Sequence, residues 1–343
     1  MKTKTLVALL MLSVANSTSA FAALDISTYI VNGEDVDVDD YPSTVAFFYD
    51  SIEYNGYYYA GSFCGGTYLD STHVLTAAHC FYDSDEARLF AIAVPQLQNE
   101  SDYPYANYIE RLRVSEVYYP NNYSNDSSAL YPNDIAIVTL EDPMSIGEAI
   151  TTADDESYRS TDESFIAVGH GNTASGVDDA DSLQAASLNY VINSECKTVF
   201  KDGAALTDKQ ICFGGDYSDA TGLRNATCSG DSGGAVYWQD GDVLTQVGIT
   251  SFGPTTCGVE SADVTSVFTE ITDYQNWIDE VLAGSISPTL TATDAERQEY
   301  IDTYGELGGA STTSSSEGSS GGGLNLMWLM ILFSLIPFRK WIN

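Results

Sequence analysis

Gly230-Asp231-Ser232-Gly233-Gly234 is the most informative stretch of this sequence, because it places a serine inside a glycine-rich turn. Two earlier stretches complete the pattern. Thr76-Ala77-Ala78-His79-Cys80 places a histidine beside a cysteine, and Asn133-Asp134-Ile135-Ala136 places a carboxylate at the head of an apolar segment. Serine, histidine and carboxylate together are the groups that nucleophilic catalysis by a hydroxyl requires.

Each of these side chains has a chemical reason to be present. A serine hydroxyl is a weak nucleophile at neutral pH, so a base must take its proton, and a histidine with a pKa of about 6.5 suits that task. Ser232 is then the nucleophile and His79 the base. Asp134 would fix the imidazole tautomer and stabilise the imidazolium. The N–H groups of Gly230 and Ser232 are placed to donate to the acyl oxygen as it becomes an anion.

In the order His, Asp, Ser, the three motifs resemble the trypsin/chymotrypsin family of serine proteases. The resemblance covers residues 30–283. It implies an all-β fold of two six-stranded antiparallel β-barrels with a C-terminal helix, and a triad in the cleft between the barrels. It also implies a serine endopeptidase that acts on protein or peptide substrates without a cofactor.

The rest of the chain agrees with an all-β domain. Short β-branched and aromatic runs are separated by Gly, Asn, Asp and Ser turns, which predicts strands at 44–49, 73–77, 134–140, 165–168 and 244–251. Thr272 and Gln275 predict a capping box that opens a helix ending at Gly284. Residues 284–323 are rich in Ser, Thr and Gly, which predicts a linker with one short acidic helix at 294–304.

Six cysteines in an exported chain indicate disulfides, although sequence alone leaves their pairing open. The resemblance implies Cys64 with Cys80, Cys196 with Cys212, and Cys228 with Cys257. The sequence contains no Cys-x-x-Cys pair and no histidine cluster of metal-ligand spacing, so no metal site is expected.

Both ends of the chain look like processing signals. Residues 1–22 have the charged, apolar and small-residue parts of a secretory signal peptide. At the other end, Gly321-Gly322-Gly323 precedes an apolar run at 324–338 and two basic residues. The run would span about 22 Å as a helix, less than the roughly 30 Å of a hydrocarbon core. Residues 324–343 resemble the GlyGly-CTERM sorting tail, with a plain membrane anchor as the alternative.

The two ends together predict a protein that is secreted, or held at the cell surface, through the periplasm of a Gram-negative bacterium. Its partners would include the export machinery and a rhomboid-type protease that removes the tail.

Ile30-Val31-Asn32-Gly33 resembles the mature N-terminus of the family. The resemblance implies that residues 23–29 form a propeptide, and that the freed α-amino group of Ile30 pairs with Asp231 to order the oxyanion turn. Tyr29 stands where trypsin-activated zymogens have Lys or Arg. The activating protease is therefore expected not to be trypsin-like, and self-activation follows if this enzyme accepts aromatic residues.

Four residues are expected to line the substrate pocket by their positions relative to the family: Ala226, Ser251, Gly253 and Ser266. Ala226 occupies the position that is acidic in trypsin, and Gly253 leaves the pocket mouth open. An apolar base and an open mouth predict cleavage after a medium or large apolar residue. Trypsin-like selectivity for Arg or Lys stays open as an alternative if Glu260 or Asp263 enters the pocket.

The charge balance excludes one class of function. The sequence has 13 Lys and Arg against 49 Asp and Glu, for a net charge of −36, whereas nucleic-acid binding needs clustered basic residues. The acidic segments 35–40 and 98–102 could bind calcium but lack the spacing of a calcium loop. A catalytically silent binding homologue and a surface adhesin are the remaining rivals, and the intact triad disfavours both.

Overall fold

The computed structural model describes residues 30–177, 181–241 and 243–307. The signal peptide, the propeptide and the apolar tail expected from the sequence lie outside the described residues. Within the described ranges, no helix is both long enough and apolar enough to cross a membrane.

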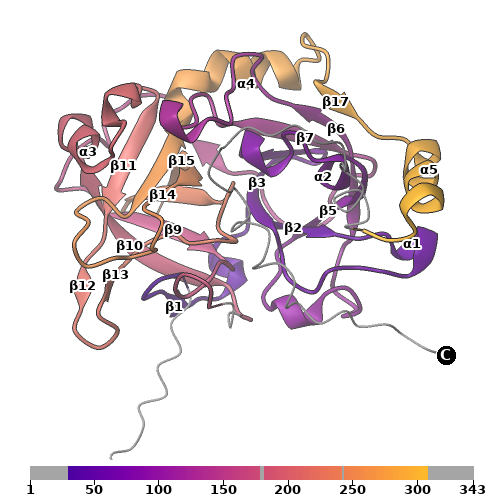
Figure 1. Ribbon diagram of the computed structural model, residues 1–343, viewed down its shortest axis with the longest axis horizontal. Helices are drawn as coiled ribbons and strands as arrows, with labels where there is room; N and C mark the ends of the chain where they lie inside the picture. Colours follow the sequence, from indigo (N-terminus) through magenta and orange to yellow (C-terminus); the bar gives the residue numbers. More distant parts are fainter. Residues whose placement is uncertain (1–29, 178–180, 242, 308–343) are drawn as a thin grey trace, which may run out of the picture.

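The first barrel is a closed ring of six antiparallel strands in the order β5–β2–β3–β4–β7–β6, with β6 also paired to β5 (Figure 1). The strands are Thr44–Tyr49 (β2), Cys64–Asp70 (β3), His73–Thr76 (β4), Ala91–Pro95 (β5), Leu112–Tyr118 (β6) and Ala136–Leu140 (β7). Alternating side chains of these strands fill the barrel, and Phe47, Val74 and Ile137 are fully buried.

The second barrel also closes on six antiparallel strands, in the order β10–β11–β16–β15–β14–β9. The strands are Phe165–Gly169 (β9), Gln184–Val191 (β10), Gln210–Gly214 (β11), Ala235–Asp240 (β14), Val243–Phe252 (β15) and Ser266–Glu270 (β16). The prediction of two six-stranded barrels is confirmed. Three short strands pair with barrel strands: Glu34–Asp35 (β1) with β10, Thr151–Thr152 (β8) with β15, and Leu290–Thr291 (β17) with β6. Tyr217–Ser218 (β12) and Leu223–Arg224 (β13) form a separate two-stranded sheet.

Helices occupy the connections and the C-terminal part of the described chain. The α-helices are Ile52–Asn55 (α1), Asp85–Phe90 (α2), Asn193–Val199 (α3), Gln275–Leu282 (α4) and Asp294–Tyr304 (α5). The 3-10 helices are Val38–Asp40 (η1), Ala78–Cys80 (η2), Glu100–Asp102 (η3), Ser127–Ala129 (η4), Gly203–Ala205 (η5) and Ile271–Tyr274 (η6).

The capping box expected at Thr272 and Gln275 is wrong. Residues 271–274 form η6, and α4 begins at Gln275 with no side-chain cap. The Thr272 hydroxyl lies 3.0 Å from the Tyr158 hydroxyl, and Gln275 Nε2 donates to the Ala153 carbonyl at 2.8 Å. Both side chains therefore bind the second barrel instead of the helix terminus.

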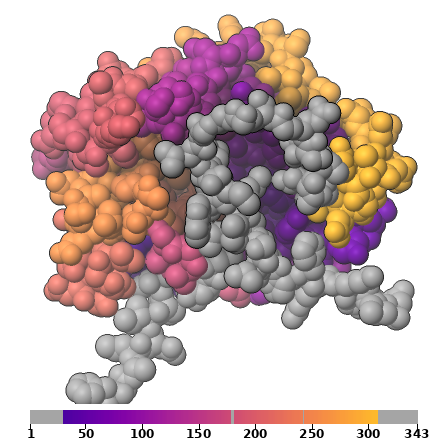
Figure 2. Space-filling view, in the orientation of Figure 1, coloured from indigo at the N-terminus to yellow at the C-terminus, as the bar shows by residue number. Residues whose placement is uncertain are grey.

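Residues 285–307, predicted as part of a linker, pack on the first barrel. Strand β17 pairs with β6, and α5 lies beside α1 and α2 (Figure 1). A capping box does occur here, between Thr293 and Glu296 at the start of α5. In the space-filling view the yellow C-terminal residues lie against indigo and violet segments of the first barrel (Figure 2).

All three disulfides implied by the resemblance are present. Cys64 is bonded to Cys80, Cys196 to Cys212 and Cys228 to Cys257. The first disulfide ties the start of β3 to η2, and the third ties the segment before Ser232 to the loop after β15. Covalent closure at these points restrains the loops around the junction of the two barrels.

We expect Phe47→Ala to lower the free energy of unfolding by about 3–5 kcal/mol, because removing a buried ring leaves a cavity. Phe47 is fully buried, with ring centroids 5.6 Å from Phe81 and 6.2 Å from Phe63. Urea unfolding measures the change. Tyr105→Ala is the control, because Tyr105 is 67% exposed. Equal losses in the two variants would contradict this account of the core.

Candidate active site

His79 and Asp134 meet at one end of the first barrel. His79 lies in η2 directly after β4, Asp134 precedes β7, and these strands pair, with Thr76 opposite Ala136. The Asp134 carboxylate accepts twice from His79, at 2.9 Å from the backbone N–H and 2.7 Å from Nδ1. These two bonds fix the imidazole and direct Nε2 away from the carboxylate.

The second barrel also contacts this carboxylate. Ser251, in β15, donates its hydroxyl to Asp134 Oδ2 at 2.5 Å. The Ser251 hydroxyl is thus directed to Asp134 and not into the pocket. Since Asp134 is fully buried, these three donors supply the hydrogen bonds that a desolvated carboxylate needs.

The pKa of the His79 imidazole lies above its ordinary value of 6.5. Burial lowers the pKa, but the negative charge of Asp134 and its hydrogen bond to Nδ1 raise it by more. The side chain keeps 23% of its surface exposed, so its free nitrogen is accessible. A raised pKa makes His79 a stronger base toward a hydroxyl proton.

Ser232 lies on the second barrel but touches the first. The Gly65 N–H donates to the Ser232 carbonyl at 2.7 Å. Gly233 has φ +79°, and a Cβ there would lie 2.2 Å from Thr76 Oγ1. Only glycine allows this close approach to the strand that precedes His79. Within the described part of the chain the Ser232 hydroxyl makes no hydrogen bond, and contacts between nucleophile and base are often looser before substrate binds.

Two backbone N–H groups in this turn have no acceptor among the described residues, and they belong to Gly230 and Ser232. The other amides of the turn are paired: Asp231 N–H donates to the Cys228 carbonyl, and Gly233 N–H to the Thr250 carbonyl. Unpaired amides beside a serine hydroxyl can stabilise an oxyanion. His79 and Asp134 are thus hydrogen-bonded to each other, and the turn that carries Gly230 and Ser232 contacts β3 and the strand that precedes His79.

Asp231 is buried at 1% exposure and directed away from Ser232. Its carboxylate accepts from the Gly171 N–H at 2.9 Å and the Cys228 N–H at 2.8 Å. Burial raises its pKa to about 7, although those two amides lower it. Sequence reasoning missed the glycines that make room for this carboxylate, because a Cβ at Gly169 or Gly171 would lie within 2.4 Å of Asp231 atoms. The Gly-His-Gly pattern at 169–171 is the signal that could have shown them.

The start of the domain lies beside the pocket. Val31 pairs with Ala226, with the Val31 N–H donating to the Ala226 carbonyl at 3.1 Å. Ile30 is fully buried and has φ +34°, a region that costs a β-branched residue about 1–3 kcal/mol. Because this torsion involves the bond to residue 29, cutting that bond removes the constraint.

Two of the residues expected to line the substrate pocket, Ala226 and Ser266, lie in the interior of the second barrel. Ala226 and Ser266 are fully buried, and the Ser266 Oγ lies 2.9 Å from the Thr227 N–H and 3.0 Å from the Thr227 hydroxyl. Sequence reasoning missed Thr227. The polar groups of Thr227 and Ser266 therefore bind each other, and neither residue brings a charge to this part of the barrel.

The two acidic residues considered for the pocket lie outside it. The Asp263 side chain is 90% exposed and 4.0 Å from the Arg224 guanidinium. Glu260 is exposed as well, and its carbonyl accepts from Arg224 Nε at 2.9 Å. Arg224 therefore holds this loop on the outer surface. Gly253 is exposed, and a Cβ at this position would lie 3.8 Å from Ser266 Cα.

No metal centre emerges from the described residues. The one group of His, Cys and carboxylate atoms close enough to share an ion is Cys64, His79 and Cys80. Both sulfur atoms are held in a disulfide, so neither can act as a thiolate ligand.

Two closed barrels with His, Asp and Ser at their junction define a chymotrypsin-like protein. The chain belongs to the Trypsin family, whose profile matches residues 30–278. Proteases of this family need no cofactor. Membership in the family supports the assignment of this chain as a serine endopeptidase.

Relatives with curated descriptions agree. The chain is 28% identical over 235 residues to a venom serine protease of Polistes dominula, covering 66% of this chain and 76% of the relative. It is 26% identical over 263 residues to CLIP domain-containing serine protease B4 of Anopheles gambiae, covering 73% and 69%.

A solved structure shares the fold. The secreted serine protease VesC from Vibrio cholerae is matched with a TM-score of 0.57 and 24% identity, over 73% of this chain. The chain spans about half the length of that structure, 48%.

We expect stability to depend on pH through Asp231 while Ile30 remains joined to residue 29. The pKa of Asp231 is about 7 in the folded chain and about 3.9 in the unfolded chain. The contribution of Asp231 to the free energy of unfolding is therefore fully present below about pH 4, and it is lost as pH rises through about 7. Urea unfolding of the uncut chain and of Asp231→Asn, both carrying Ser232→Ala to prevent self-cleavage, measures it. The difference between the two should shrink from pH 4 to pH 7, and a constant difference would contradict the assignment.

Proposed function

We propose that this chain is a secreted serine endopeptidase in which Ser232 is the nucleophile, His79 the general base and acid, and Asp134 the residue that orients and stabilises His79. The observation that carries the proposal is the buried Asp134 carboxylate, which binds His79 twice and Ser251 once while the Ser232 turn presents two unpaired amides.

The reaction follows from these positions. Ser232 Oγ attacks the carbonyl carbon of the substrate as His79 Nε2 takes the hydroxyl proton, and the amides of Gly230 and Ser232 bind the oxyanion. Collapse breaks the C–N bond, and His79 gives the proton to the leaving amine. A water molecule then attacks the acyl carbon as it loses a proton to His79 Nε2. The bond between the acyl carbon and Ser232 Oγ breaks, and His79 returns the proton to Ser232 Oγ as the acid product leaves.

We propose cleavage after medium or large apolar residues. Ala226 provides no charge at the pocket base, and the hydroxyls of Thr227 and Ser266 bind each other. Arg224 lies beside Asp263 on the outer surface, which disfavours trypsin-like selectivity. The catalytically silent alternative is disfavoured because all three triad side chains are present and two of them are hydrogen-bonded.

Synthesis as a zymogen is supported by the state of Asp231 and Ile30. Among the described residues no cationic side chain pairs with the buried Asp231 carboxylate, so an incoming α-amino group would compensate its charge. Cleavage before Ile30, with removal of residues 23–29, would supply that group. An activating protease, or this enzyme itself acting after Tyr29, is the expected partner.

Export through the periplasm of a Gram-negative bacterium, with later removal of residues 324–343, completes the proposal. Its support is the layout of the two ends of the sequence. The solved structure of similar fold is that of a secreted bacterial protease.

Ser232→Ala should lower kcat by about 10⁴-fold or more, because a triad without its nucleophile retains only binding and oxyanion stabilisation. Hydrolysis of a peptide amide by the chain cut before Ile30 measures the loss. Ser229→Ala is the matched control, because Ser229 is exposed on the same turn. Full activity in Ser232→Ala would overturn the mechanism.

Cleavage sites in a diverse peptide library, identified by mass spectrometry, test the pocket. We expect cuts after Phe, Tyr, Leu or Met, since the pocket base carries no charge. Cuts after Arg or Lys that disappear in Asp263→Asn or Glu260→Gln would replace this assignment with the trypsin-like alternative. Cuts after Tyr would also make Tyr29 a site of self-activation.

A further inference from the structure

Residues 285–307, here called the C-terminal strap, connect two loops that approach Ser232 from the first barrel. The first loop, 50–63, leads into β3, where Cys64 precedes the Gly65 N–H that binds the Ser232 carbonyl. The second loop, 81–90, follows directly after His79 and Cys80. The disulfide between Cys64 and Cys80 joins the active-site ends of these loops.

The strap binds the first loop through α1. The Tyr54 hydroxyl donates to Asp294 at 2.7 Å, and the Asn55 amide donates to the Gly305 carbonyl at 3.1 Å. These contacts engage the first residue of α5 and the residue directly after its last, so the short α1 is bound at both ends of that helix.

The strap binds the second loop through α2. The Tyr300 hydroxyl donates to Glu86 at 2.9 Å, and its ring packs 5.3 Å from that of Phe90. Arg88 donates to Glu296 and to the Thr291 carbonyl, each at 2.9 Å. Two residues of α5 and one of β17 thus contact one turn of α2.

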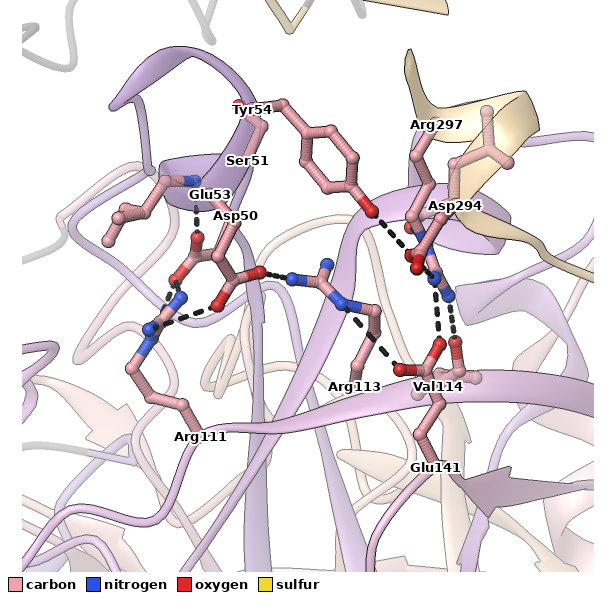
Figure 3. A network of polar contacts seen from close by, with 12 residues as sticks. Asp50, Ser51, Glu53, Tyr54, Arg111, Arg113, Val114, Glu141, Asp294 and Arg297 are labelled. Atoms are coloured by element: carbon pink, nitrogen blue, oxygen red, sulfur yellow. Dashed lines mark hydrogen bonds and ion pairs between the residues drawn. The ribbon is translucent and has the colours of Figure 1, made fainter. Parts of the chain in front are cut away.

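Arg297 lies at the centre of these contacts and is fully buried (Figure 3). Its guanidinium donates to the Leu89 carbonyl at 2.7 Å, to the Val114 carbonyl at 2.8 Å, and to Glu141 at 2.7 Å. The nitrogen that donates to Glu141, Nη1, also donates to Asp294 at 2.9 Å. One cation therefore links α5 to α2, to β6 and to the end of β7, and burial without these acceptors would be costly.

Aromatic side chains continue the connection toward the cleft. Tyr49 packs on the apolar cluster formed by α5 and α2, and its ring stacks 4.0 Å from that of Phe63. Phe63 lies beside Cys64, and its ring is 6.1 Å from that of Phe81, which lies beside Cys80. Close-packed side chains transmit displacement with little slack.

The position of the pocket shows which part of a substrate these loops would meet. Ala226, Gly253 and Ser266 all belong to the second barrel, so the residue before the cleaved bond is held there. The residues that follow the bond must leave Ser232 on the opposite side, toward loops 50–63 and 81–90. These two loops are here called the leaving-group wall.

We propose that the C-terminal strap positions the leaving-group wall, so that Arg297 and Tyr54 set recognition of the residues that follow the cleaved bond and leave the pocket unaffected. The inference rests on the proposed function. It makes Arg297 and Tyr54 positioning residues, because neither lies at the reacting atoms.

The test uses partitioning of the acyl-enzyme by the full chain cut before Ile30. A peptide methyl ester with Phe before the ester bond forms the acyl-enzyme and releases methanol, so nothing occupies the leaving-group wall. A dipeptide amide then competes with water: its amine nitrogen attacks the acyl carbon, His79 takes the proton and returns it to Ser232 Oγ, and a peptide bond forms. The ratio of peptide to acid product reports binding at the wall.

We expect Arg297→Lys to lower this ratio by about tenfold while ester consumption stays within about twofold, since small displacements of a binding wall act on the group bound there. Tyr54→Phe removes one hydroxyl and should lower the ratio about threefold, which keeps the test available if Arg297→Lys unfolds. Tyr304→Phe is the control, because Tyr304 is 38% exposed and its hydroxyl makes no hydrogen bond within the described residues.

Two results would overturn the inference. An unchanged ratio in the variants would show that the strap does not affect the wall. An equal fall in ester consumption and in the ratio would assign the strap a general structural role. Absence of Ser232-dependent ester hydrolysis in the parent chain would instead overturn the proposed function, and this inference with it.

Discussion

The buried Asp134 carboxylate is the constraint on which the rest of the structure depends. A charge removed from water needs donors on every side, and here they come from His79 on the first barrel and Ser251 on the second. Thr269, in β16, also donates its hydroxyl to the Asp134 carbonyl at 2.7 Å. The two barrels therefore meet at the Asp134 carboxylate, to which both donate hydrogen bonds. The hydrogen bonds from His79 also align its imidazole.

The residues alone predicted an all-β domain and the chemistry of Ser232, His79 and Asp134, whereas the two barrels and the three disulfide pairings were implied by the family resemblance. That resemblance is visible because it rests on short motifs: a glycine that must adopt positive φ beside Ser232, a cysteine next to His79, and an apolar strand after Asp134. Each motif has few alternative structures, since its residues are demanded by local backbone geometry or by covalent chemistry.

Features made by residues far apart in the chain could not be predicted in the same way. Arg297 lies in α5, a polar helix whose sequence suggests exposure to solvent. Its guanidinium is nevertheless buried, and it donates to the carbonyls of Leu89 and Val114, which lie 208 and 183 residues earlier in the chain. Thr272 and Gln275 have the spacing of a capping box, but Tyr158 and Ala153 compete for their side chains. The exposure of Asp263 depends on Arg224 across a loop. Tertiary contacts decided all three cases.

The pairing of Val31 with Ala226 joins two properties that are usually discussed separately. Val31 is the second residue after the proposed activation bond, and Ala226 is the proposed floor of the substrate pocket. Two antiparallel backbone hydrogen bonds thus join the proposed new terminus to the proposed pocket floor. A backbone shift on one side of this pairing, such as the one that a freed terminus would make, would therefore be transmitted directly to the other side.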